Sequence, residues 1–110
     1  MELSELCRET RNQLFERGWA QGTVRNAGGN VCIMGAAIAA LGLDAAMDPR
    51  YFGAEKVRML LAFDGLVADV AKTNDAPEFN DSVETTFTAV IDTLDLAEKR
   101  AMLTEEGVAL

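Results

Sequence analysis

Apolar residues recur along the first eighteen positions at the spacing of an α-helix. Ser4 is a suitable N-cap, because a serine hydroxyl can accept a hydrogen bond from the first helical turn. Gly18 is expected to end the helix, since glycine adopts the left-handed conformation that closes a last turn. Trp19 would then fold back on that turn. The positions that form the apolar face are Leu3, Leu6, Cys7, Thr10 and Leu14.

Two short segments, residues 21–25 and 30–33, flank the sequence Asn26-Ala27-Gly28-Gly29. Asparagine and paired glycines supply the positive φ angles of a tight turn, so the pattern predicts a short β-hairpin over residues 21–33. From Val31 or Cys32 to Leu41 the chain is apolar on every side and rich in alanine and glycine, which predicts a buried central helix. The strand and the helix compete for residues 31–33.

The second half of the chain predicts two longer helices. Asp48-Pro49 is a helix start signal, and an apolar stripe beyond it predicts a helix from about Ala54 to Lys72. Residues 73–78 are expected to form a loop. Asp81 and Glu84 match a capping box, so the last long helix is expected to start at Asp81. Its apolar face would comprise Val83, Phe87, Val90, Ile91, Leu94 and Ala97.

These elements predict a single, mainly α-helical domain over residues 1–110. About four helices would pack around the buried Ala/Gly-rich helix, with the short hairpin beside them. Residues 104–110 are expected to form a frayed tail.

The net charge of −8 is unevenly distributed. Residues 1–43 hold four arginines and four glutamates, so the whole excess lies in residues 44–110. Such a surface repels a polyanion, which argues against direct nucleic-acid binding and favours a protein partner with a basic surface. The alternative is a solvated acidic face that keeps the protein soluble. The residues of the predicted acidic face are Asp64, Asp69, Asp75, Glu78, Glu84, Asp92 and Asp95.

Several chemistries lack their usual residues. The chain has no histidine, which removes the usual general base and every Cys/His zinc site. The oxygen-bearing side chains of residues 74–81 do not have the spacing of an EF-hand loop. No metal, no cofactor and no catalytic residue are therefore predicted, and an enzyme is disfavoured.

The longest apolar run, residues 31–43, is shorter than the roughly 20 residues that cross a bilayer. The first residues do not resemble a secretion signal. We therefore expect a cytoplasmic protein with reduced cysteines and no membrane contact.

Three short motifs occur in order: Gly18-Trp19-x-Gln21-Gly22, Cys32-x-x-Gly35-Ala36 and Phe79-Asn80-Asp81. In this respect the chain resembles a small family of actinobacterial and actinobacteriophage proteins of unknown function, in which tryptophan is common at the position of Phe79. The resemblance implies a phage or actinobacterial origin and names no reaction. If the protein is phage-encoded, it would act in the host cytoplasm.

The motif residues Trp19, Gln21, Cys32, Phe79, Asn80 and Asp81 are the candidate binding residues. One interpretation is structural: Gln21 and Asn80 satisfy backbone groups where the hairpin meets the last helix, and Trp19 and Phe79 cover that junction. The other is a small-ligand or peptide site, or a small enzyme, at the same place. The leading hypothesis remains an interaction or accessory protein that binds through its acidic half. A homodimer formed through an exposed apolar helix face is a further alternative.

Overall fold

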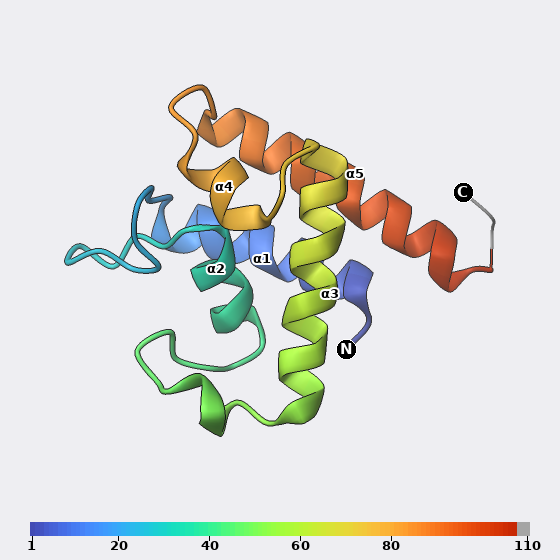
Figure 1. Ribbon diagram of the computed structural model, residues 1–110, viewed down its shortest axis with the longest axis horizontal. Coiled ribbons are helices and arrows are strands. Elements are labelled where there is room, and N and C mark those ends of the chain that lie inside the picture. The colour runs from blue at the N-terminus through green and yellow to red at the C-terminus, as the bar shows by residue number, and fades with distance from the viewer. Residues whose placement is uncertain (108–110) are drawn as a thin grey trace.

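The computed structural model describes residues 1–107, and the last three residues lie outside the described part. Within this range the chain forms five α-helices and one 3₁₀ turn (Figure 1). In chain order they are α1 (Leu3–Arg17), α2 (Ile33–Ala40), η1 (Pro49–Tyr51), α3 (Ala54–Ala71), α4 (Ala76–Asp81) and α5 (Phe87–Glu105). The predicted mainly helical class is confirmed.

One hydrophobic core joins all five helices. Helix α1 packs against α2, α3 and α5, and α3 also contacts α2 and α4. Each helix supplies a buried apolar side chain to this core: Leu6, Ile33, Phe63, Phe79 and Leu94. Helix α2 is buried only on the face that meets α1, α3 and α4, whereas Ile38, Ala39 and Ala40 are half-exposed. The Ala/Gly-rich helix is therefore shorter and less enclosed than its composition predicts.

The N-cap of the first helix lies two residues before the predicted serine cap. Glu2 is the N-cap, and its N–H donates to the Glu5 side chain at 3.4 Å. Ser4 lies inside the first turn, where its hydroxyl and N–H donate to the Glu105 carboxylate at 2.5 and 3.1 Å. Ser4 thus ties α1 to the end of α5 instead of capping α1.

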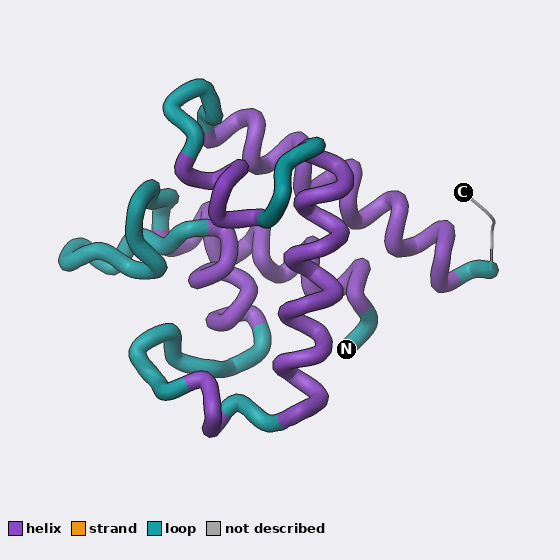
Figure 2. The backbone as a smooth tube through the Cα atoms, in the orientation of Figure 1, coloured by secondary structure: helices purple, strands orange, loops and turns teal. Residues whose placement is uncertain are grey.

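The predicted β-hairpin is not confirmed. Val31 makes isolated bridges to both Trp19 and Arg25, and no ladder of paired residues forms among residues 1–107. Cys32 already serves as the N-cap of α2, so the second segment has no further residues to pair. Residues 18–32 instead form the loop that extends furthest from the helices (Figure 2).

The prediction for the third helix is accurate. Asp48 accepts a hydrogen bond from the Arg50 N–H at 2.9 Å and starts the 3₁₀ turn, with Pro49 at its first position. Helix α3 then runs from Ala54 to Ala71. It ends at Lys72, which adopts a left-handed conformation with φ of 61°.

The predicted start of the last helix is wrong. Residues predicted as a loop form α4 instead, because Asp75 caps it by accepting the Glu78 N–H at 2.8 Å. Asp81 therefore ends a helix, and α5 starts at Phe87, where Thr86 accepts the Ala89 N–H at 3.1 Å. Val83, expected on the apolar face, is 98% exposed in the intervening loop.

Helix α5 continues to Glu105, so the first residues of the predicted frayed tail are helical, and a turn follows at residues 106 and 107. The remaining part of that predicted tail, residues 108–110, lies outside the described residues. None of the helices in residues 1–107 combines the length and the hydropathy needed to span a bilayer.

Candidate functional site

The side chain of Asn80, in the last turn of α4, is fully buried and makes four hydrogen bonds. Its Oδ1 accepts from the Trp19 indole N–H at 2.8 Å and from the Ile33 backbone N–H at 2.9 Å. Its Nδ2 donates to the Ala20 carbonyl at 3.0 Å and to Asp81 Oδ1 at 2.9 Å. Both donors and both acceptor positions of the amide are therefore used.

The neighbours of Asn80 extend this network. The Gln21 side-chain amide donates to the carbonyls of Asn80 and Ser82 at 3.0 and 2.9 Å, which satisfies acceptors that the end of a helix leaves free. Asp81 Oδ1 accepts the Gly22 N–H at 2.9 Å. We call this set, Trp19, Gln21, Asn80 and Asp81, the Asn80 junction; it joins residues 19–22 to residues 80–82.

An aromatic cluster covers the Asn80 junction. The Trp19 ring stacks on Phe87 with centroids 6.1 Å apart and an interplanar angle of 20°. Phe15 meets Phe87 edge-on at 5.7 Å. Phe79, which the sequence suggested as the partner of Trp19 in covering the junction, lies in the hydrophobic core. The sequence pattern places Phe87 on the apolar face of the last helix but does not predict its contact with Trp19, because the two residues are sixty-eight positions apart.

Cys32 has a structural environment. Its Sγ accepts the Gly35 N–H at 3.3 Å as the N-cap of α2, and its side chain is buried. Burial raises the pKa of the Cys32 thiol, although backbone amides of Gly35 and Met34 act in the opposite direction. A nucleophilic cysteine requires a lowered pKa, so this environment favours the protonated thiol.

Cys7 is more strongly disfavoured as a thiolate. Its burial in α1, with smaller contributions from the nearby carboxylates of Glu98 and Glu105, raises the pKa of the Cys7 thiol to about 12. At neutral pH it therefore behaves as a small apolar side chain of the core.

The Asn80 junction holds two parts of the chain together and leaves little for a ligand. Within residues 1–107, no buried side-chain nitrogen or oxygen lacks a hydrogen-bond partner. None of the four junction residues lines any of three surface hollows found elsewhere on the described part of the chain. In the same range no three His, Cys, Asp or Glu side chains lie close enough together to hold a metal ion.

The predicted acidic residues divide into two groups. Four of them interact within the chain. Asp64 accepts the Ala76 N–H at 2.7 Å, Asp75 caps α4, Glu78 accepts the Asn74 N–H at 3.2 Å, and Asp95 pairs with Arg11.

The other three, Asp69, Glu84 and Asp92, are exposed and form no side-chain hydrogen bond or ion pair within residues 1–107. They belong to the second half of α3, the loop after α4 and the first half of α5, which gather along the upper edge of the molecule (Figure 1). We call these three residues the acidic end.

The structure is thus that of a small helical protein in which a buried asparagine connects two distant segments. The profile of a family of unknown function, DUF6197, matches residues 1–100, and the chain belongs to this family. No curated protein matches the chain, and no solved structure does.

Proposed function

We propose that this protein is an interaction or accessory protein that binds a basic surface of another protein through its acidic end. The supporting observation is the presence of three exposed carboxylates, Asp69, Glu84 and Asp92, that have no partner within residues 1–107. Carboxylates free of internal partners can meet cationic groups of another molecule without first breaking contacts in their own chain. Asp75, the N-cap of α4, and Glu78, within α4, are also exposed and lie between Asp69 and Glu84 in the sequence.

The distribution of charge supports the same proposal. The excess of −8 lies in residues 44–110, and a negative field over one part of a surface attracts basic partners while it repels nucleic acids. The proposal therefore includes no direct binding to DNA or RNA.

The setting of the proposal is the cytoplasm. The motif resemblance implies a phage or actinobacterial origin, and for a phage-encoded protein the partner belongs to the host. A ligand site or enzyme at the Asn80 junction has no comparable support, because its amide groups are already bonded within the chain.

A pair of charge-matched variants tests the proposal. The triple variant Asp69→Asn/Glu84→Gln/Asp92→Asn removes the acidic end. The control Glu16→Gln/Glu55→Gln/Glu106→Gln removes three other exposed carboxylates and changes the net charge equally. Each tagged protein is incubated with lysate of the source organism or its host. Bound proteins are identified by mass spectrometry, and the dissociation constant of a purified partner is then measured.

The expected partner has a basic surface and binds the wild type and the control variant. It binds the triple variant at least about 10-fold more weakly, since close charge pairs contribute more than about 1.4 kcal/mol. Equal retention of every partner by both variants, or in 1 M salt, where the Debye length is about 3 Å, contradicts the proposal. Light scattering of the same samples measures whether the protein is a homodimer, as one sequence-based alternative predicts.

A further inference from the structure

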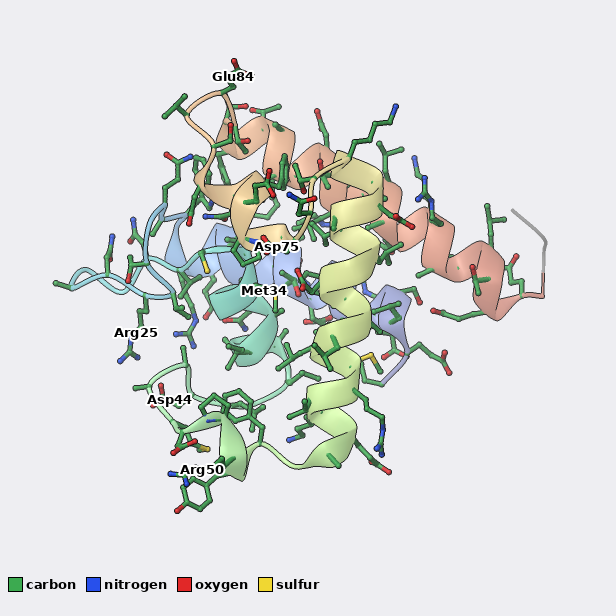
Figure 3. The ribbon with its side chains drawn as sticks, in the orientation of Figure 1. Arg25, Met34, Asp44, Arg50, Asp75 and Glu84 are labelled. Atoms are coloured by element: carbon green, nitrogen blue, oxygen red, sulfur yellow. The ribbon has the colours of Figure 1, made fainter. Side chains whose placement is uncertain are left out.

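A pocket of about 340 Å³ lies between α2 and the two segments that flank it. One wall is the loop that carries Arg25, and the opposite wall is the segment from Gly42 to Met47. Figure 3 shows Arg25 extending from its loop toward the segment that carries Asp44. The pocket is separate from the Asn80 junction and from the acidic end.

Two arginines line the pocket, and the guanidinium group of each keeps unused donors. Arg17 donates through Nε to Gln13 at 2.6 Å, and within residues 1–107 its two terminal amino groups form no hydrogen bond. Arg25 comes within 3.8 Å of Asp44 but forms no side-chain hydrogen bond in the described chain. Asp44 is turned toward its own loop, where Oδ1 accepts the Ala46 N–H at 2.8 Å. The pocket therefore holds two cationic groups and one carboxylate.

The remainder of the lining is small or apolar. Ala39, on the half-exposed side of α2, and the buried Gly35 add little side-chain volume, and Val31, Leu43 and Met47 add apolar walls. Gly35 has a second effect, because a Cβ placed there would lie 2.3 Å from the Val24 carbonyl oxygen. The absence of a side chain at Gly35 lets the loop lie directly on α2, which brings Arg25 to the pocket.

We infer that this pocket binds a small carboxylate with a compact apolar body. The planar fork of a guanidinium matches a carboxylate and can donate two parallel hydrogen bonds to it. Val31, Leu43 and Met47 provide contacts for the apolar part of such a ligand. Small-molecule sites range from about 300 to 1,000 Å³, so a pocket near the lower limit selects a small ligand.

The inference is tested by ¹H–¹⁵N NMR titration of the full chain with benzoate, benzyl alcohol and inorganic phosphate. Benzoate is expected to cause saturable shifts at the amides of Gly35, Ala39 and Gly42. It should bind at least about 10-fold more tightly than benzyl alcohol, which has the same ring without the charge. Benzoate should also bind more tightly than phosphate, which lacks an apolar body.

Two variants identify the binding groups. Arg17→Gln/Arg25→Gln is expected to weaken benzoate binding at least about 10-fold. The control Arg58→Gln/Arg100→Gln changes the net charge equally at another surface and should leave binding unchanged. In a separate variant, Ala39→Leu keeps both arginines but fills the pocket, and it should abolish the saturable shifts.

Four outcomes overturn the inference. Absence of saturation by benzoate means that the pocket does not recognise this class of ligand. Equal affinity for benzyl alcohol shows that the guanidiniums take no part. Equal affinity for phosphate, or equal weakening by the control pair, shows a general response to anions. If a double arginine variant has lost its native NMR spectrum, each of its two substitutions is tested singly by the same criteria.

Discussion

At the Asn80 junction, the side-chain amide of one buried asparagine has all of its hydrogen-bonding positions filled from within the chain. In the pocket beside α2, by contrast, two arginines keep hydrogen-bond donors that have no partner in residues 1–107. Both regions involve residues of the loop between α1 and α2. They differ in exposure: Asn80 is completely buried, and the Arg25 side chain is 45% exposed.

This difference separates polar groups that maintain the fold from polar groups that are available to another molecule. A buried donor or acceptor that loses its partner costs about 1–3 kcal/mol, so the Asn80 junction must be complete for the protein to be stable. An exposed guanidinium keeps water as a partner and costs the fold little when it is unpaired. Four sets of variants, taken from the largest expected effect to the smallest, test this separation.

The largest effect is expected for Asn80→Ala. It leaves the Trp19 and Ile33 N–H groups and the Ala20 carbonyl without their partner, which should lower the free energy of unfolding by about 3–5 kcal/mol. Urea denaturation followed by circular dichroism measures the change. The control is Asn74→Ala, at an exposed loop position, which should change stability by less than about 0.5 kcal/mol. Equal effects of the two substitutions would contradict a structural role for the Asn80 junction.

A pair of glycine substitutions tests how the loop is seated. Gly35→Ala forces a Cβ against the Val24 carbonyl and should cost about 2 kcal/mol, because backbone must move to relieve the overlap. It should also weaken benzoate binding through displacement of Arg25. The control is Gly65→Ala, in α3, where nothing beyond the neighbouring backbone of the same helix lies within 4 Å of the added Cβ. This change should stabilise the protein by about 0.5–1 kcal/mol. Thermal unfolding of both variants distinguishes the two effects; a neutral Gly35→Ala would show that the loop is not held by this contact.

A smaller loss is expected for Trp19→Phe. The phenyl ring can keep the contact with Phe87 but removes the donor to Asn80 Oδ1, which retains the Ile33 N–H as a partner. We expect a decrease of about 1–2 kcal/mol in the free energy of unfolding. Because this variant lacks tryptophan fluorescence, circular dichroism is used for the measurement. A loss as large as that of Asn80→Ala would mean that the indole, and not the asparagine, dominates the Asn80 junction.

The smallest effect on stability is expected for Arg17→Gln/Arg25→Gln, the variant that should impair benzoate binding. Within residues 1–107 the only charge contact of these two arginines is the exposed pair of Arg25 with Asp44 at 3.8 Å, so the free energy of unfolding should change by less than about 0.5 kcal/mol. Chemical denaturation measures this change. A loss of more than about 2 kcal/mol would show that these arginines support the fold and would end the contrast with the Asn80 junction.

The elements that the sequence predicted well have signals within a few residues of each other. Helix α3 combines a long apolar stripe with Pro49 ahead of it, so both its type and its bounds follow from local pattern. The error at the last helix has an equally local cause. Asp81 and Glu84 have the spacing of a capping box, but Asp75 starts a helix of only six residues before them, and such a short element lacks an apolar period.

The candidate residues show a similar limit. The motifs suggested that Trp19, Gln21 and Asn80 meet, and the structure places them in hydrogen-bond contact. The hairpin prediction is not confirmed, because Val31 pairs on one side with Trp19 and on the other with Arg25, an arrangement of three segments that two-strand pattern rules do not describe. The sequence does not predict that Arg17 and Arg25 line one pocket, since the distance between them depends on how the loop lies against α2.

The hydrogen bonds of Asn80 also bear on the order in which the protein folds. The hydrogen bonds that join residues 19–22 to residues 80–82 in the Asn80 junction connect positions 59 to 61 residues apart, on either side of α2 and α3. The bond from the Ile33 N–H to Asn80 connects positions 47 residues apart. Closing such a long stretch of chain is entropically costly until the intervening helices have packed, so these contacts should form after the folding transition state. Substitutions at Asn80 should then accelerate unfolding and leave the refolding rate nearly unchanged. Asn80 would thus form its contacts late in folding and, by slowing unfolding, would set the lifetime of the native state.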